Sequence, residues 1–211
     1  ILTHAHFGHV DGLGLFGRET LNTRGLELYA SNSMLSLVQD TPHWAMMVEQ
    51  GVFSTNSVIS GNVHSLSPEV SLEPVEVPHR AELSDMHAFI VRGPNRAVLF
   101  LPDHDRWDDT LNLHQASTIR SWLTSLRVDV ALVDGTFWNT NELQGRRQEE
   151  VPHPTVSETL ERLGPRVDGD PEIVFIHLNH TNPLHDVSSA EHQAVIDMGW
   201  AVGEQGMNFT L

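Results

Sequence analysis

The chain has 211 residues and a hydrophobic fraction of 39%, which fits one globular domain with a sizeable core. Its twelve basic residues are all arginine and its acidic residues number 28, so the formal net charge of −16 disfavours a nucleic-acid partner. The absence of cysteine excludes disulfides and thiolate metal sites, and no apolar run is long enough to predict a membrane span.

The sequence of the first half of the chain predicts helices around one short strand, followed by a β-rich block. Helical spacing predicts a helix over 11–23, which Arg24 and Gly25 end. The other elements predicted in this half are a strand at 26–30, helices at 31–38 and 42–50, and strands at 63–66, 70–77, 88–92 and 97–101.

The second half alternates between helices and strands. This alternation, with the β-rich block before it, predicts sheets covered by helices in an α/β layered sandwich. The polar segment 139–150 is expected to form a mobile loop or lid. The predicted elements are helices at 111–126, 157–163 and 188–198, and strands at 128–133, 173–178, 200–202 and 208–211.

The most informative stretch is the beginning of the chain, where an apolar lead-in runs into His4, His6 and His9. Residues two apart on an extended chain point to the same side, so His4 and His6 can converge on one ion. Imidazole suits zinc, iron, copper or nickel. A metal site is therefore the favoured interpretation, against a strand end that is histidine-rich by chance.

Four later strands also end in residues that can bind metal. In open α/β sheets, functional groups gather at one set of strand ends, so these side chains are expected to join the N-terminal histidines. One such residue is weak evidence, whereas five stretches in one chain strongly indicate a metal site. The later residues are His79, Asp103, Asp134, His177 and His180.

In this order the motifs resemble the metallo-β-lactamase superfamily and, more narrowly, the B-protein family of pyrroloquinoline quinone (PQQ) biosynthesis. The resemblance implies an αββα sandwich with a metal centre between its sheets. That family has an additional N-terminal portion, so one sheet is expected to be incomplete here, and 1–211 is expected to be the larger C-terminal part of a longer polypeptide. The matching stretches are 2–9, 77–80, 93–96, 101–107, 134–137, 151–154 and 175–183.

Gly8 distinguishes this chain from the hydrolases of the superfamily, which usually carry an aspartate at that position. Glycine has no donor atom, so a second metal site loses a carboxylate. The resemblance implies a complete first site and a weaker second one, which argues against hydrolysis by two clamping ions. The first site would use His4, His6, His79 and Asp103, and the second His9 and His177, with His180 as a ligand or proton shuttle.

The resemblance implies an iron(II)-dependent oxygenase, with zinc or manganese as other possible ions. It would use dioxygen to hydroxylate the tyrosine-derived ring of a small, peptide-derived Glu-Tyr intermediate, and it would be cytoplasmic. Asp134 or His180 would move protons. Arg80, Arg146 or Arg147 would pair with substrate carboxylates, and His153 would line the pocket. His43, His64, His104, His114, His185 and His192 are expected to be surface or helix residues, and His87 is expected to be incidental.

Two other functions stay open from the sequence. A metal-dependent hydrolase of the same fold would act on an ester, lactone or phosphodiester without oxygen. A carrier would bind the quinone or its precursor without catalysis. A homodimer, or another chain that supplies the missing N-terminal strands, is also expected as a partner.

Overall fold

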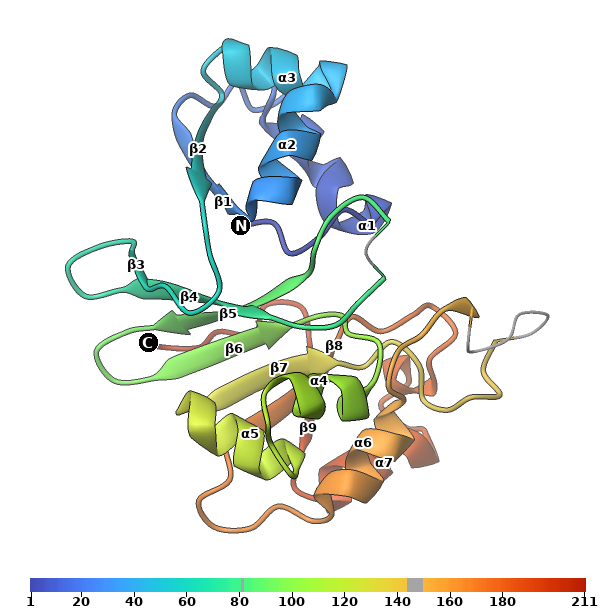
Figure 1. Ribbon diagram of the computed structural model, residues 1–211. Helices are drawn as coiled ribbons and strands as arrows, with labels where there is room; N and C mark the ends of the chain where they lie inside the picture. Colours follow the sequence, from blue (N-terminus) through green and yellow to red (C-terminus); the bar gives the residue numbers. More distant parts are fainter. Residues whose placement is uncertain (81, 144–149) are drawn as a thin grey trace.

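The computed structural model describes residues 1–80, 82–143 and 150–211 and arranges them around two β-sheets (Figure 1). The smaller sheet, as far as the described residues show, is a parallel pair of strands in the N-terminal part. A parallel pair requires a crossover, and two helices provide it. The elements of this part are α1 (Phe7–Val10), the 3₁₀ helix η1 (Asp11–Phe16), β1 (Leu26–Ala30), α2 (Asn32–Asp40), α3 (Pro42–Glu49) and β2 (Phe53–Ser57).

The larger sheet has seven strands in the order β3-β4-β5-β6-β7-β8-β9, antiparallel from β3 to β6 and parallel from β6 to β9. The carboxyl ends of β6, β7 and β8 therefore lie at the same edge of the sheet. Its strands are β3 (His64–Ser65), β4 (Ser71–Glu76), β5 (His87–Arg92), β6 (Ala97–Leu101), β7 (Val130–Asp134), β8 (Glu172–Ile176) and β9 (Ala201–Val202). The helices are α4 (Trp107–Leu113), α5 (Ile119–Leu126), α6 (Val156–Leu163), the 3₁₀ helix η3 (Pro183–His185) and α7 (Ala190–Asp197).

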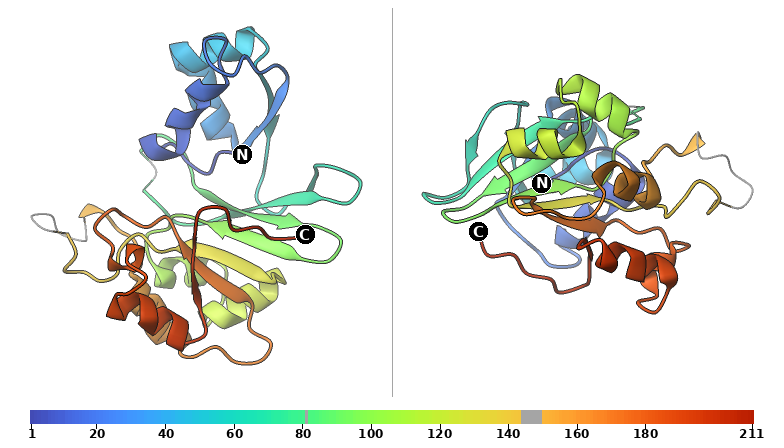
Figure 2. Two further views of the ribbon diagram at one scale, coloured as in Figure 1. Left: turned by 180° about the vertical axis from the view of Figure 1, so that it is seen from behind. Right: turned by 90° about the horizontal axis from the view of Figure 1, so that it is seen from below.

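Helices α4 to α7 cover one face of the large sheet, and the N-terminal part stands on the other side (Figures 1 and 2). Under the N-terminal part, Val58, Leu72 and Phe89 pack together with Tyr29 of β1. The resulting order of helices, small sheet, large sheet and helices confirms the predicted α/β sandwich.

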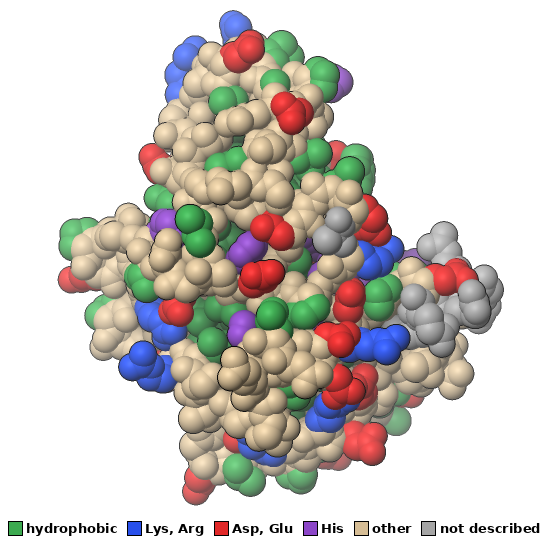
Figure 3. All heavy atoms as spheres, viewed as in Figure 1, with side chains coloured by type: hydrophobic (Ala, Val, Ile, Leu, Met, Phe, Trp, Pro, Cys, Tyr) green, Lys and Arg blue, Asp and Glu red, His purple; other side chains and the backbone are tan. Residues whose placement is uncertain are grey.

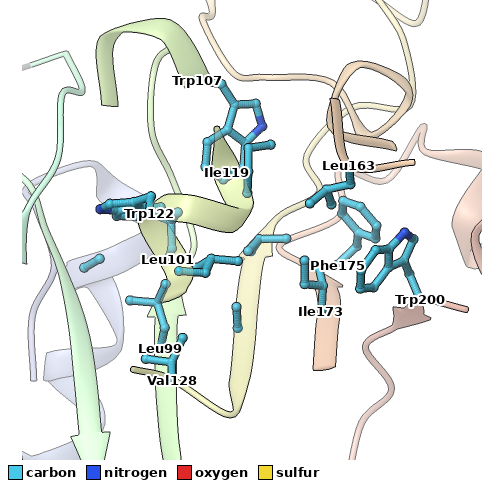
Figure 4. Packing of buried hydrophobic residues seen from close by; sticks show 14 of the residues in the cluster. Leu99, Leu101, Trp107, Ile119, Trp122, Val128, Leu163, Ile173, Phe175 and Trp200 are labelled. Carbon is cyan, nitrogen blue, oxygen red and sulfur yellow. The ribbon is translucent and has the colours of Figure 1, made fainter. Parts of the chain in front are cut away.

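The main core lies between the large sheet and its helices (Figure 4). Leu99 and Leu101, two apart on β6, both enter it, as the period of a strand requires. The buried indole of Trp107 is satisfied because its Nε1 donates to the hydroxyl of Thr159 at 2.8 Å. This core holds the strand ends that follow β6, β7 and β8 in fixed positions.

Three of the differences in extent between predicted and observed elements have a local cause. The helix predicted at 11–23 begins earlier as α1 and ends as η1 at Phe16, within a stretch rich in glycine. The helix predicted at 111–126 is two helices: Gln115 has a φ of 53° between them, and Thr118 starts α5 with a capping box. The strand predicted at 173–178 ends at Ile176, because His177 adopts a φ of 61°.

Two further differences involve strands. Strand β2 was not predicted individually, since its sequence, Phe-Ser-Thr-Asn-Ser, has only one apolar residue. The strand predicted at 208–211 is not formed. Instead, Phe209 and Leu211 pack against Val98, Val130 and Val174 on the face of the large sheet opposite α4 to α7.

Charged side chains of both signs are interspersed over the face shown in Figure 3. Acidic residues predominate in the whole sequence, with a formal net charge of −16. Of the helices formed by the described residues, none has the length and apolar character needed to cross a membrane.

Candidate metal centre

The N-terminal segment is held between the two sheets by its backbone. The N–H of Leu2 donates to the carbonyl of Tyr29 in β1, and the N–H of His87 donates to the carbonyl of Thr3. Leu2, Thr3 and His4 are all buried. This anchoring places His4 at the junction of the sheets. It also gives His87, which was expected to be incidental, a buried position beside the segment that carries the site.

Three imidazoles converge at this junction and form the first cluster: His4, His6 and His79. The Nδ1 of His6 lies 2.9 Å from the Nε2 of His4 and 3.2 Å from the Nε2 of His79. His79 follows β4, so the cluster joins two parts of the chain separated by more than seventy residues. The structure thus brings the Nε2 of His4 and the Nδ1 of His6 face to face.

The opposite ring nitrogen of each imidazole is bonded away from the cluster. The Nδ1 of His4 bonds the hydroxyl of Thr3 at 3.1 Å, the Nε2 of His6 bonds Glu82 at 3.2 Å, and the Nδ1 of His79 bonds Asp105 at 3.0 Å. These partners orient each ring and leave its other nitrogen facing the cluster centre. Three nitrogen lone pairs turned toward one point fit a bound cation, and outer carboxylates of this kind make imidazole a stronger ligand.

Replacing Asp105 with alanine is expected to weaken metal binding by about 10–100-fold, because the His79 ring loses the carboxylate that orients it. Competition with a chelator of known affinity measures this change. Asp109→Ala, on the exposed side of α4, is the matched control and is expected to bind metal as the parent does. Equal affinity in the two variants would mean that Asp105 does not orient a ligand.

A second cluster adjoins the first through Asp103, which follows β6. Its Oδ2 lies 2.8 Å from the Nε2 of His9 and 3.4 Å from the Nε2 of His4, while its Oδ1 lies 3.6 Å from the Nδ1 of His177. The Nε2 atoms of His9 and His177 are 3.1 Å apart. Asp103 therefore stands between the clusters, where its two oxygens can serve both. Asp103 belongs to two groups of possible ligands, one with His4 and His9 and the other with Asp134 and His177, and these groups form the second cluster.

Asp134, at the end of β7, is fully buried and organises the strand ends. Its Oδ1 accepts from the backbone N–H and the hydroxyl of Thr136, at 2.9 and 2.7 Å, and its Oδ2 accepts from the N–H of His104 at 3.3 Å. The Nδ1 of His153 lies 2.8 Å from Asp134 and 3.2 Å from Asp103. His153, expected in a pocket wall, therefore lies beside the second cluster, against both of its carboxylates.

The electrostatics favour the protonation states that metal binding needs. Burial lowers the pKa of His4 to about 3, against the opposing charge of Asp103, and burial also lowers the pKa of His6 and of His177. Burial works to raise the pKa of Asp103, but its hydrogen bond to His9 and the charges of His177 and His153 hold that pKa well below its usual range. Neutral imidazoles and an ionised carboxylate are the forms that coordinate metal.

His153 shows the opposite shift. Burial works to lower its pKa, yet the charge and hydrogen bond of Asp134 outweigh burial and raise it. A raised pKa favours the protonated ring, which is a proton donor and not a metal ligand. His153 and Asp134 together therefore form a buried pair that can hold a proton beside the clusters.

Several predicted residues lie elsewhere. His180 is exposed, and within the described part of the chain it makes no hydrogen bond or ion pair with either cluster. Arg146 and Arg147, with half of the loop predicted at 139–150, lie outside the described residues. Arg80 is half-buried and stands 3.9 Å from Glu82.

Two histidines predicted at the surface or on a helix are buried. His104 is fully buried against Trp107, and its Nδ1 bonds the hydroxyl of Thr110 at 2.9 Å. His192 lies on α7 as expected, but it is buried, and its Nδ1 bonds the carbonyl of Leu184 at 3.0 Å. The prediction was wrong for His104, because local spacing does not reveal which side chains face the core.

Sequence reasoning missed the residues that orient the ligands, namely Thr3, Glu82, Asp105 and Thr136, whose hydroxyl lies 2.8 Å from the Nδ1 of His177. Asp105 could have been found, because it follows Asp103 at the spacing that marks one side of an extended strand. Glu82 carries no such signal, since only the tertiary fold brings it to His6.

This centre, at the edge shared by two sheets, defines a metal-binding protein of the αββα type. The chain belongs to the beta-lactamase superfamily domain family, whose model matches residues 1–178. It is similar to the coenzyme PQQ synthesis protein B of Xanthomonas campestris pv. campestris (strain B100), with 25% identity over 100% of this chain and 72% of that protein.

Solved structures share the fold. The crystal structure of Zn(2+)-bound PqqB from Methylobacterium extorquens matches with a TM-score of 0.74 and 20% identity, over 100% of this chain and 70% of that one. CmlA from Streptomyces venezuelae, a diiron beta-hydroxylase, matches with a TM-score of 0.52 and 14% identity, over 96% of this chain and 42% of that one. The predicted superfamily and fold are confirmed.

Proposed function

We propose that this chain carries the catalytic centre of a PQQ biosynthesis protein B, a metal-dependent hydroxylase that acts on the tyrosine-derived ring of a Glu-Tyr intermediate. The observation that carries the proposal is similarity to a coenzyme PQQ synthesis protein B along the whole chain. Iron(II) is the proposed ion, with zinc and manganese as alternatives.

His4, His6 and His79 would hold the ion, and Asp103 would complete the set or bridge to the second cluster. Histidines combined with one carboxylate and open positions are typical of non-heme iron oxygenases. The ion would supply binding and activation of dioxygen. Gly8 supports this proposal over binuclear hydrolysis because it gives no carboxylate to the second cluster. There is space for a side chain at this position, since a Cβ on Gly8 would meet no atom within 4 Å.

Proton transfer would be the task of Asp134 through His153, whose raised pKa suits a proton donor. His180 stays a proposed shuttle on the exposed loop after His177. Arg80 is proposed to pair with a substrate carboxylate, as is Arg146. In the overall reaction one oxygen atom enters the ring as a hydroxyl and the other leaves as water, so a two-electron reductant must be supplied.

The second cluster favours one alternative. His9 and His177 lie against Asp103 and offer further ligand atoms beside the first cluster, as a binuclear hydrolase requires. Such an enzyme would cleave an ester, lactone or phosphodiester with zinc or manganese. Its reaction would not consume oxygen.

The deciding experiment uses anaerobically purified protein loaded with iron(II) or with zinc. Each form receives a cross-linked Glu-Tyr peptide, ascorbate as reductant and isotopically labelled dioxygen. We expect labelled hydroxyl in the product only with iron, and no product from iron-treated His79→Ala. Zinc-dependent cleavage of an ester or phosphodiester, without label in the peptide, would establish the hydrolase instead.

A further inference from the structure

An apolar pocket of about 460 Å³ opens beside the first cluster. Its volume lies in the range of small-molecule sites. It lies between α1, α2, α3 and the segment after His79, which runs next to α1 in both Figure 1 and Figure 2. The apolar part of its lining is formed by Phe7, Val10, Leu37, Trp44 and Leu83.

The pocket adjoins the cluster on its accessible side. The side chains of His4 and His79 are 1% and 0% exposed, whereas that of His6 is 30% exposed, and His6 itself lines the pocket. A molecule that approaches the ion from this side must therefore pass His6. A ligand seated in the pocket would lie against both Trp44 and His6.

Opposite charges line the same pocket. Arg80 NH1 and Glu82 Oε1 are 3.9 Å apart, too far for a hydrogen bond. The buried Nε of Arg80 has no hydrogen-bond partner within the described part of the chain. Because that nitrogen is buried, a ligand would reach Arg80 at the terminal nitrogens of its 36% exposed side chain, and a carboxylate is their natural acceptor. The carboxylate of Glu82 is 58% exposed and offers an acceptor for an ammonium group.

We propose that this pocket binds an aromatic α-amino acid group, with the ring against Trp44, the carboxylate on Arg80 and the ammonium on Glu82. The apolar lining accounts for the ring, and the adjacent opposite charges account for the zwitterion. This inference rests on the proposed function, because it identifies the subsite that would hold the tyrosine-derived part of the substrate. Trp44, which also packs against the N-terminal core, would then serve both the core and the ligand.

Calorimetric titration of the zinc-loaded protein tests the proposal without requiring catalysis. L-tyrosine is compared with tyramine, which lacks the carboxylate, with 3-(4-hydroxyphenyl)propionate, which lacks the ammonium, and with L-alanine, which lacks the ring. We expect L-tyrosine to bind most tightly, by at least about tenfold over each analogue, since each lost contact to a charged group is worth roughly that factor. Equal binding of L-alanine would mean chelation of the ion alone and would overturn the proposal.

Variants locate the site. Arg80→Gln is expected to weaken L-tyrosine binding by about 10–100-fold while leaving tyramine nearly unchanged. Trp44→Ala is expected to weaken every ring-bearing ligand by about 3–10-fold. Arg18→Gln and Met46→Ala, both exposed and outside this pocket, are the matched controls. If Trp44→Ala unfolds, Leu83→Ala serves in its place, because Leu83 is 66% exposed and still lines the pocket.

The two proposals fail in different ways. Unchanged binding in Arg80→Gln and in the pocket variants, combined with iron-dependent hydroxylation, would overturn this subsite and leave the proposed function standing. Selective L-tyrosine binding that responds to Arg80 and Trp44, without any hydroxylation, would leave the subsite standing and overturn the function.

Discussion

Replacing His79 with alanine is expected to weaken metal binding by more than about 100-fold. Groups that only orient a ligand already contribute about 10–100-fold, so loss of a ligand itself must cost more. The His79 side chain is buried in the first cluster, where its Nε2 faces His6. Metal content after dialysis against a weak chelator measures the effect, for iron and for zinc.

His43→Ala is the control for that experiment, because His43 is exposed and lies outside both clusters. It is expected to retain metal as the parent chain does. Thermal unfolding adds a second measure: metal should raise the midpoint of the parent and of His43→Ala but not of His79→Ala, because only binding to the folded state stabilises it. Full metal retention by His79→Ala would place the ion outside the first cluster.

Replacing Asp134 with alanine is expected to lower the free energy of unfolding by about 3–5 kcal/mol, the usual cost of breaking a buried ion pair. The variant leaves His153 without its closest carboxylate and removes the acceptor of three donors on Thr136 and His104. Urea unfolding in the presence of a strong chelator measures the change, so that metal binding does not contribute.

Asp134→Asn separates stability from catalysis. It keeps an oxygen acceptor but loses the charge, so it should cost less stability than alanine while still impairing proton transfer through His153. The exposed Asp168→Ala is the matched control and is expected to unfold as the parent does. Unfolding of Asp134→Ala at the same urea concentration as Asp168→Ala would show that the buried network does not stabilise the fold.

The sequence by itself determined the strands that end in metal-binding residues and the class of the fold. Leu99 and Leu101 alternate as a strand requires, and Asp103 follows them at once, so both the element and its polar end can be predicted from local spacing. His4 and His6 were likewise predicted to converge, because two residues apart on an extended segment share a side. Such predictions succeed where the residues concerned are only about two positions apart in the sequence.

The tertiary structure alone decided which of these groups meet and which support them. Glu82 reaches His6, and His153 enters the space between Asp103 and Asp134, across sequence separations that no local pattern encodes. The same holds for His104, which is buried because α4 packs over the strand ends, and for His180, which the loop after His177 leaves exposed. Long-range packing sets these positions, since it depends on the whole core and not on the neighbouring residues.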